Sequence, residues 1–379
     1  MDTVAPRVLS QAERLAWLRL IRTKNVGPIT FRQLLRRFGS AEAAIDALPD
    51  LARRGGRARP ISVCSMAAVR REIDTLYTQD ARLIALVEPD YPPALAALDD
   101  APPVLSYFGH THLLQRHAIA VVGARNASAN GRRLARQITA ELGAAGLLVV
   151  SGMARGIDTA AHEGSLDTGT VAVVAGGIDV IYPEENTALH GEIKARGVVL
   201  SEMPPGTVPQ ARHFPRRNRL ISGMAMGTLV VEAAPRSGSL ITARFALDQG
   251  REVFAVPGSP LDPRARGCNE LIRQGAVLVE SAADVLRALE ATMRAPAAEP
   301  ATAEFLGADP VSLPESDIAE GRQTIEELLG PTPAAVDEVI RQCQVSAAIV
   351  HLVLLELELA GRLERHPGNR VALIAGASD

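Results

Sequence analysis

Two short apolar runs in the sequence each end at a glycine that is closely followed by an arginine. The run AIAVVGAR contains Gly123 and Arg125, and the run LLVVSGMAR contains Gly152 and Arg155. A glycine turn between a strand and a helix lets an anion approach backbone N–H groups, and arginine adds a planar fork of donors that matches phosphate. The two turns therefore predict two phosphate-binding positions.

The stretch ARHFPRRNRLISG, residues 211–223, concentrates further positive charge at the predicted start of a helix, beside Phe214. This cluster is larger than a mononucleotide needs and favours a polyanion partner. We expect some of its arginines to pair instead with carboxylates such as Glu202 or Glu232. The predicted anion-binding residues are Gly123, Arg125, Ser151, Gly152, Arg155, Gly156, Arg212, Arg216, Arg217, Asn218 and Arg219, of which Asn218 and Arg219 are expected mainly to shape the start of the helix.

Candidates for catalysis are few. Asp158 and His162 stand four residues apart on a predicted helix and could form an acid–base pair. No nucleophile is placed beside them, so we favour an ordinary helix start in which the dipole stabilises the carboxylate. Neither GxGxxG after a strand nor GxxxxGK[ST] occurs, and no His, Cys and carboxylate cluster has metal spacing. The sequence predicts no catalytic residue, no metal and no cofactor.

An alternation of strands and helices positions the predicted anion-binding residues. Short valine-rich runs separated by helical patterns are typical of an α/β fold, here a doubly wound Rossmann-like sheet covered on both faces. Such sheets bind ligands outside the carboxyl ends of their strands, where the glycine turns should meet. The apolar runs are 118–122, 147–150, 170–175, 198–200, 228–231, 252–256 and 276–279.

A helical module is expected before the sheet domain, which we place at residues 86–290. Residues 1–85 show helical patterns broken at Asn25–Pro28, as in a SAM-like or helix-hairpin-helix module. Residues 1–60 hold 12 Lys/Arg against 5 Asp/Glu, an excess that either marks a polyanion partner or belongs to solvated helix faces. Both interpretations stay open from the sequence.

A second small domain is expected after a proline- and alanine-rich acidic linker at residues 291–321. Residues 322–379 show three helical patterns and a hairpin, which predicts a winged helix. Its reading helix would be SAAIVHLVLLELELAG, which has no Lys or Arg and two Glu. Readout in the major groove needs donors and phosphate contacts, so we favour protein contact or simple packing for this helix.

Composition excludes several classes of protein. No window approaches the roughly 20 apolar residues of a membrane span, and the first residues lack the pattern of a signal peptide. Cys64, Cys268 and Cys343 are scattered, so we expect a reducing cytoplasm and no membrane partner. Aromatic residues make up only 3% of the chain, so nucleic-acid binding should depend on phosphates and be nearly blind to sequence. About five phosphate contacts predict a slope near −3.5 for log K against log salt.

Seven motifs in order resemble the DNA-processing protein A family (DprA, also called Smf): GARNAS, SGMARGIDTAAH, GGIDVIYP, SEMPPG, HFPRRNRLISG, VVEAAPRSGSLITA and FAVPGS. The resemblance implies a non-catalytic protein that binds and protects incoming single-stranded DNA and loads the RecA recombinase during natural transformation. It also implies a homodimer through the sheet domain, for which Leu271, Ile272, Val277 and Leu278 are our candidates. One departure is Asn130, where an aromatic residue is expected before Gly131.

Two other functions are weighed against this one. Phosphoribohydrolases of the lysine-decarboxylase-like group resemble the sheet domain, but Thr242 stands where their catalytic glutamate would be, and Glu232 is the nearest carboxylate that could replace it. The second is a nucleotide-sensing regulator whose winged helix binds duplex DNA, which the acidic reading helix disfavours.

Overall fold

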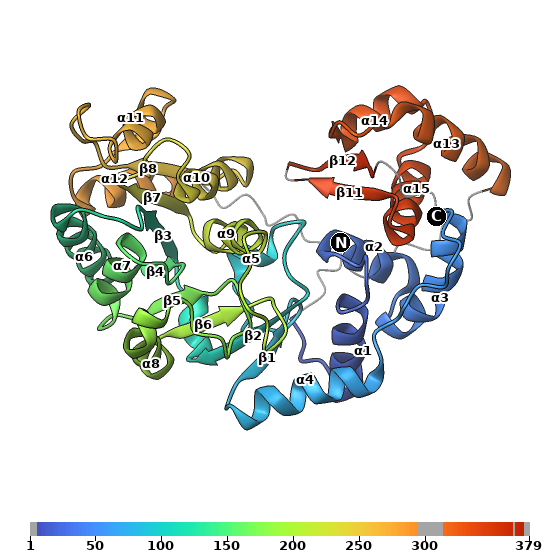
Figure 1. The fold of residues 1–379 in the computed structure, drawn as a ribbon, viewed down its shortest axis with the longest axis horizontal. Coiled ribbons are helices and arrows are strands. Elements are labelled where there is room, and N and C mark those ends of the chain that lie inside the picture. Colours follow the sequence, from blue (N-terminus) through green and yellow to red (C-terminus); the bar gives the residue numbers. More distant parts are fainter. Residues whose placement is uncertain (1–5, 295–313, 367, 375–379) are drawn as a thin grey trace. The chain divides into compact units, whose positions relative to one another are not determined.

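The structure is a computed structural model that describes residues 6–294, 314–366 and 368–374 of the chain. Contacts divide the chain into two compact units (Figure 1). Among the described residues, one unit is built from residues 72–294 together with residues 6–8, and the other combines residues 9–71 with residues 314–366 and 368–374. The helical module and the winged helix thus belong to one unit, although they come from opposite ends of the chain.

The first unit is a Rossmann-like sheet whose strands, in the described residues, follow the order β1-β2-β6-β5-β4-β3-β7-β8-β9. Strands β3 to β9 are parallel to one another, and each of the seven predicted runs forms one of them. Their bounds are β3 Ala118–Gly123, β4 Leu148–Ser151, β5 Thr170–Val173, β6 Val198–Ser201, β7 Gly227–Val231, β8 Glu252–Ala255 and β9 Val277–Leu278.

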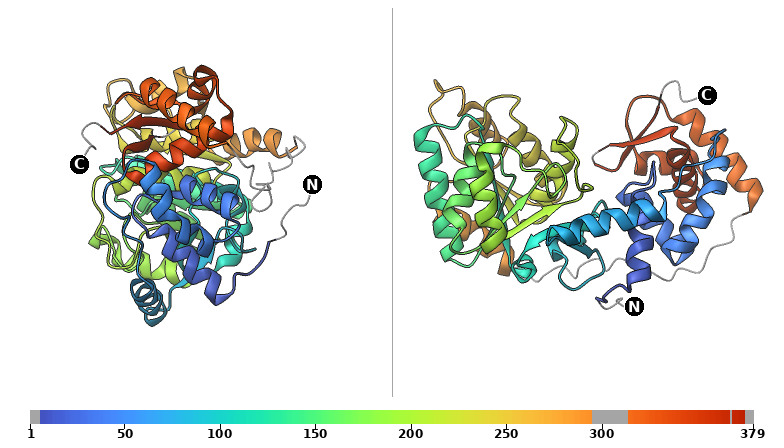
Figure 2. Two further views of the ribbon diagram at one scale, coloured as in Figure 1. Left: turned by 90° about the vertical axis from the view of Figure 1, so that its right-hand side faces the viewer. Right: turned by 60° about the horizontal axis from the view of Figure 1, so that its bottom comes forward.

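Helices cover the sheet on both faces, as the valine-rich strands require (Figures 1 and 2). The helices α6 and α7 pack on each other and α12 packs on α6, whereas α9 and α10 form a separate pair. The bounds are α5 Pro93–Ala96, α6 Ala129–Ala144, α7 Ile157–Ser165, α8 Thr187–Arg196, α9 His213–Gly223, α10 Gly238–Asp248, α11 Arg266–Arg273 and α12 Ala282–Arg294, with short 3-10 turns at Thr111–Gln115 and Glu184–Asn186.

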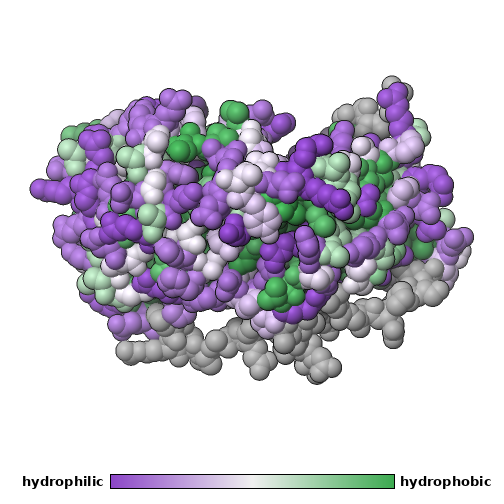
Figure 3. Space-filling model, turned by 90° about the horizontal axis from the view of Figure 1, so that it is seen from below, coloured by the Kyte–Doolittle hydropathy of each residue, from purple (hydrophilic) through white to green (hydrophobic). Residues whose placement is uncertain are grey.

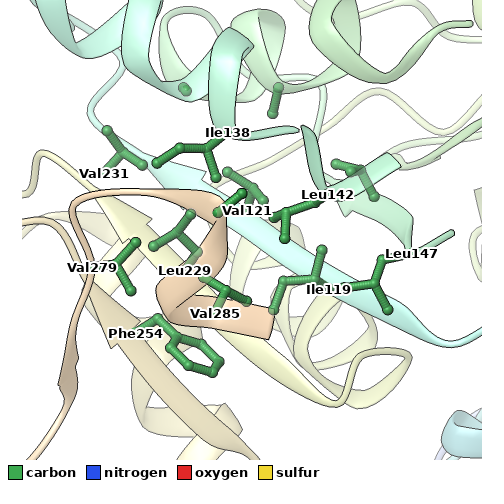
Figure 4. Close-up of a cluster of buried hydrophobic side chains, with 14 of the residues drawn as sticks. Ile119, Val121, Ile138, Leu142, Leu147, Leu229, Val231, Phe254, Val279 and Val285 are labelled. Carbon is green, nitrogen blue, oxygen red and sulfur yellow. The ribbon is translucent and has the colours of Figure 1, made fainter. Parts of the chain in front are cut away.

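The core between β3 and its covering helices explains why α6 forms where it does. Ile138 and Leu142 lie one turn apart on α6 and pack with Ile119 and Val121 of β3 and Val285 of α12 (Figure 4). Ser128 caps the first turn of α6 by accepting a hydrogen bond from the Gly131 N–H at 2.9 Å. The start of α6 is thereby fixed next to the end of β3.

The edge of the sheet corrects our domain boundary. Strands β1 (Arg82–Ala85) and β2 (Val104–Gly109) add an antiparallel pair beside β6, and β1 was not predicted. The first unit therefore begins near residue 72 instead of residue 86, because β1 pairs with β2 and not with the helical module. The expected linker is also shorter, since α12 continues to Arg294 and α13 begins at Glu315; the residues between them lie outside the described ranges.

The second unit packs the winged helix on the helical module. The module contains α1 Gln11–Ile21, α2 Pro28–Phe38, α3 Ala41–Arg54 and the start of α4 Met66–Thr78. The winged helix contains α13 Glu315–Leu328, β10 Ala334–Ala335, α14 Val336–Cys343, α15 Ala347–Ala360, β11 Leu363–His366 and β12 Arg370–Leu373. Helix α15 lies against α3 and α2 (Figures 1 and 2), so the expected reading helix packs within the chain; contact with another protein stays a prediction.

Candidate functional site

The carboxyl ends of the parallel strands bring three sequence-distant residues into one cluster, in which Phe214 is half-buried and the other two residues are exposed. The guanidinium carbon of Arg125, in the loop after β3, lies 5.2 Å from the centre of the Phe214 ring on α9. The Tyr182 ring, in the loop after β5, lies 5.9 Å from the Phe214 ring at an interplanar angle of 58°. Tyr182 is 51% exposed and Arg125 is exposed. A cation and two accessible rings therefore share one patch of surface.

Three further arginines are exposed at this edge. The Arg155 side chain is 60% exposed and its Nη1 lies 3.4 Å from Glu185. The Arg216 side chain is 57% exposed and its Nε lies 3.7 Å from Glu202, and Arg212 is exposed at the N-cap of α9. The Arg155–Glu185 pair is exposed on both sides and contributes little free energy, so a phosphate group can replace Glu185 at low cost. Glu202 is buried and pairs with Arg219, whereas the Arg216 guanidinium itself reaches solvent. We call Arg125, Arg155, Arg212 and Arg216 the outer arginines.

Two backbone N–H groups of the second glycine turn already donate to a side chain of the protein, contrary to our prediction. The N–H groups of Gly152 and Ala154 donate to the buried Asp158 carboxylate at 3.1 and 3.3 Å. The protein's own carboxylate thus occupies the position that a phosphate oxygen would take. Gly152 is needed for a different reason: a Cβ there would overlap the Arg217 guanidinium.

The first glycine turn is closed in the same way. The Ser128 N–H donates to Glu232 at 2.8 Å and the Ser128 hydroxyl donates to the same carboxylate at 2.5 Å. A Cβ on Gly123 would overlap the carbonyl oxygen of Val231, so this glycine permits β3 and β7 to approach and not a ligand. Glu232 therefore does not orient Arg216 or Arg219 as we expected; it holds the start of α6.

The residues beside the two turns have structural contacts as well. The hydroxyl of Ser151, which is buried, donates to the Val121 carbonyl at 2.6 Å and joins β4 to β3. Gly156 is the N-cap of α7, with a φ of +81° that favours glycine. Neither residue presents a donor side chain to solvent, so the anion-binding capacity of this edge comes from arginine side chains.

Arg217 lies inside the protein, although we expected it to extend the phosphate track. It is 5% exposed, and its Nη1 donates to the carbonyl oxygens of Gly152 and, at 2.6 Å, Val173. Burial lowers the pKa of Arg217 to about 10, with the Asp158 carboxylate opposing that change. The guanidinium remains charged at neutral pH and ties the ends of β4 and β5 to α9.

Asn218 and Arg219 have the structural roles that we expected. Arg219 is 8% exposed and pairs with Glu202, and it also lies 3.5 Å from Asp100. Burial opposes the charge of Arg219, but the Glu202 and Asp100 carboxylates outweigh it and raise its pKa. The Asn218 side chain accepts from Arg217 Nε at 3.1 Å. We call Arg217 and Arg219 the inner arginines.

Asp158 and His162 do not form an acid–base pair. His162 Nδ1 lies 2.8 Å from the Thr170 hydroxyl, which donates to the Val149 carbonyl, so Nδ1 carries the proton of the neutral ring. Burial, and secondly the Arg217 charge, lower the pKa of His162 to about 3. Burial raises the pKa of Asp158 against the Arg217 charge and two backbone hydrogen bonds. Asp158 therefore stabilises the glycine turn from the first turn of α7, as we favoured, and His162 packs separately against Thr170.

Sequence reasoning missed Tyr182, because low aromatic content directed attention to phosphates alone. The only signal was that Tyr182 follows an apolar run and a Gly-Gly turn on the same sheet edge as Arg125. Asn130, where an aromatic residue was expected, instead lines a pocket of about 480 Å³ beside Glu232. The rings of Tyr182 and Phe214 lie next to each other at this edge instead.

Other kinds of site find no support within the described ranges. No group of three or more His, Cys, Asp and Glu side chains there could hold a metal ion. No helix in those ranges is long and apolar enough to cross a membrane, and hydrophilic side chains predominate on the face shown in Figure 3.

Comparisons with known families cover almost all of the described chain. The sequence profile of DNA recombination-mediator protein A matches residues 82–290. The profile of the DprA-like N-terminal HHH domain matches residues 11–75, and that of the DprA winged helix domain matches residues 278–369. The three matches follow the order of the modules seen in the structure.

Individual relatives agree with these profiles. Protein Smf of Synechocystis is 30% identical over 96% of this chain and 99% of its own length. A putative DNA processing protein DprA of Mycobacterium tuberculosis is 35% identical over 96% of this chain and 95% of its own length.

Two solved structures are similar to this chain. DNA processing protein A from Streptococcus pneumoniae matches with a TM-score of 0.59 and 35% identity, over 74% of this chain and 98% of that one. The protein from Helicobacter pylori, studied for its single-stranded DNA binding mode, matches with a TM-score of 0.51 and 27% identity, over 56% of this chain and 96% of that one.

Proposed function

Since the chain belongs to the DNA recombination-mediator protein A (DprA/Smf) family, we propose that it binds single-stranded DNA across the carboxyl edge of its sheet. One observation carries this proposal: Arg125 and Tyr182, both exposed, flank the partly exposed Phe214 ring, and the other outer arginines lie on the same edge. Single-strand binding combines basic side chains along the backbone with rings on which bases stack. The single-stranded DNA binding mode studied in the Helicobacter pylori protein supports the same ligand here.

The proposed binding mode differs from the phosphate-only mode that composition suggested. Phosphates contact the outer arginines, and an unpaired base stacks on Phe214 or Tyr182, which a paired base inside a duplex cannot do. Stacking tolerates every base because each has a flat π face, so binding remains nearly blind to sequence. With four outer arginines, the slope of log K against log salt should be near −2.8, less steep than the slope expected from five contacts.

The test is equilibrium binding of the protein to a fluorescent single-stranded oligonucleotide and to its duplex, each across a salt series. We expect tighter binding of the single strand and a slope of about −3. Equal binding of both forms, or binding that salt leaves unchanged, would refute the proposal.

We further propose that the protein is non-catalytic and acts in the cytoplasm, where it protects incoming single strands and loads the RecA recombinase during natural transformation. The support is the family, together with the burial of His162 and of the Thr170 hydroxyl beside it, which donates to the Val149 carbonyl. Loading is tested by the rate of RecA filament formation on strands coated with single-strand binding protein. A rate unchanged by this chain would contradict loading.

A homodimer through the sheet unit is also part of the proposal. Strand β9 is the last strand of the sheet and pairs only with β8 in the described residues. Leu278 on this edge is 46% exposed, whereas Leu271, Ile272 and Val277 are partly buried. An exposed apolar edge strand favours pairing with a second copy. Sedimentation of the parent and of Leu278→Lys should show a dimer and a monomer; a monomeric parent would exclude the dimer.

The phosphoribohydrolase alternative has weaker support. Thr242 is buried, and Glu232, the carboxylate that could replace the missing glutamate, already accepts two hydrogen bonds from Ser128. We expect no ribose 5-phosphate to be released from nucleoside monophosphates, and measurable release would revive the enzyme hypothesis.

A further inference from the structure

Helix α15 has two apolar stripes, although a winged helix needs only one for its own core. Val350, Val353 and Leu357 belong to the winged-helix core. Leu352, Leu355 and Leu359 are at most 3% exposed, yet they are not part of that core cluster. Their spacing of three and four residues places them on one face of the helix. A helix with two apolar stripes needs a covering element over each of them.

The helical module supplies the second cover. Helix α15 packs along α3, which buries Ala44, Leu48 and Ala52 among its apolar residues. At the end of α3 the backbone approaches so closely that a Cβ on Gly55 would overlap the carbonyl oxygen of Glu356. Glycine is therefore needed at this position for docking of the winged helix.

Polar contacts close the same interface at the end of α15. The Leu359 carbonyl accepts from Asn25 Nδ2 at 3.2 Å and from Arg57 Nη1 at 3.5 Å. In return, Arg362 Nη1 of the winged helix donates to the Gly55 carbonyl at 3.2 Å. Donors from the basic module thus meet the negative end of the α15 dipole.

The acidic residues of α15 are used within the winged helix. Glu356 is buried and pairs with Arg322 of α13. Glu358 accepts from Arg365 of β11 at 2.8 Å. Neither side chain is placed to read a nucleic acid, and Leu357 between them belongs to the winged-helix core.

We propose that α15 is an intramolecular docking helix whose resident partner is the helical module, so that the two ends of the chain act as one cooperative body and the winged helix does not read duplex DNA. This role is independent of single-strand binding by the sheet unit. It assigns the excess of basic residues near Asn25 and Arg57 partly to the interface, and it makes the apolar sequence of α15 a requirement of docking.

The single tryptophan of the chain provides the test. Trp17 lies in α1, 5% exposed, with its ring centre 5.0 Å from that of Phe31 in α2, so its fluorescence reports unfolding of the helical module. Val371 lies in the winged-helix core and is fully buried. If both segments form one body, Val371→Ala should lower the urea midpoint of the Trp17 transition by about 1 M. A Trp17 midpoint that Val371→Ala leaves unchanged would refute the proposal.

A large side chain at Gly55 should separate α15 from α3, so that destabilising the winged helix no longer destabilises the helical module. In the Gly55→Leu background, Val371→Ala should no longer shift the Trp17 midpoint, which is a double-mutant test of the interface. Gly191→Leu is the matched control, because a side chain at Gly191 in α8 meets open space and that helix belongs to the other unit. Coupling that survives Gly55→Leu and also the docking-face variant Leu352→Ala/Leu355→Ala would contradict the proposed interface.

Binding of duplex DNA distinguishes a docking helix from a masked reading helix. We expect both undocked variants to bind a duplex oligonucleotide within about twofold of the parent, since α15 offers no Lys or Arg to phosphates or base edges. A gain of about tenfold or more would mean that docking hides a DNA-binding surface, and it would overturn the assignment of α15.

Discussion

Helix α9 carries exposed and buried arginines within four residues. The buried ones stabilise the fold, whereas we propose that the exposed ones bind DNA. The outer Arg216 is more than half exposed and lies 3.7 Å from Glu202. The inner Arg217, its neighbour in sequence, is buried and donates to the ends of two strands. Both residues look alike in a list of basic residues. The comparison shows that charge at a helix start indicates a ligand only where the charged group reaches solvent.

The largest effect should come from removing an inner arginine. Arg217→Ala leaves the carbonyls of Gly152 and Val173 without their common donor and removes the charge that favours the buried Asp158 carboxylate. Removal of such a buried charged group costs about 3–5 kcal/mol of unfolding free energy. Arg216→Ala should cost less than about 1 kcal/mol, because its side chain is more than half exposed and Glu202 keeps its closer partner, Arg219. Urea unfolding of both variants measures the difference. Equal losses would remove the distinction between inner and outer arginines.

The next effect concerns binding by the outer arginines. The double variant Arg125→Ala/Arg155→Ala should unfold like the parent, yet bind single-stranded DNA at least about tenfold more weakly, since contacts to charged groups contribute about 1.5–3 kcal/mol each. The salt slope should also become shallower by about 1.4.

Arg287→Ala offers a control for this double variant. Its side chain is 76% exposed on α12 and forms only a surface pair with Asp284, so binding should change little. A double variant that folds normally and binds as well as the parent would exclude Arg125 and Arg155 from the DNA site.

A smaller effect should separate charge from stacking at the same surface. Phe214→Leu keeps an apolar side chain but removes the ring between Arg125 and Tyr182, and base stacking contributes about 1–3 kcal/mol per base. Affinity for single strands should fall while the salt slope stays the same, because no phosphate contact is lost. A changed slope with unchanged affinity at low salt would show that the ring only positions Arg125.

Much of the fold followed from the sequence, because buried parallel strands and amphipathic helices have distinct periodicities. Strand β1 was missed because its four residues, RLIA, give too short a pattern and its pairing with β2 is set by tertiary structure. The docking of α15 on α3 could not be predicted from the sequence either. A second apolar stripe shows that a cover exists, but it does not say which segment of the chain provides it.

The sequence predicts the sheet edge at which we propose the DNA site, and that location stays a prediction. Gly123 and Gly152 lie at this edge, yet backbone N–H groups beside them donate to Asp158 and Glu232, the second of which is remote in sequence. Whether a turn is open depends on such distant partners. The same limit applies to arginines, since burial of Arg217 depends on the strand ends that surround it.

The smallest effect tests the inner region by pH. His162 has its pKa lowered to about 3 by burial and by the Arg217 charge, whereas an unfolded histidine titrates near 6.5. Between these values the unfolded chain binds more protons, so the unfolding free energy falls as pH falls through this window. From pH 6.5 to 5.5 the His162 contribution should be about 1 kcal/mol.

His162→Gln, which keeps a polar group near Thr170, should reduce the pH dependence of the unfolding free energy by that amount. The difference between the two proteins isolates His162 from Asp158, whose raised pKa acts in the opposite direction. Identical pH profiles for the parent and His162→Gln would mean that the ring is already solvated in the folded protein, and that the inner region is less tightly closed than the contacts of Arg217 indicate.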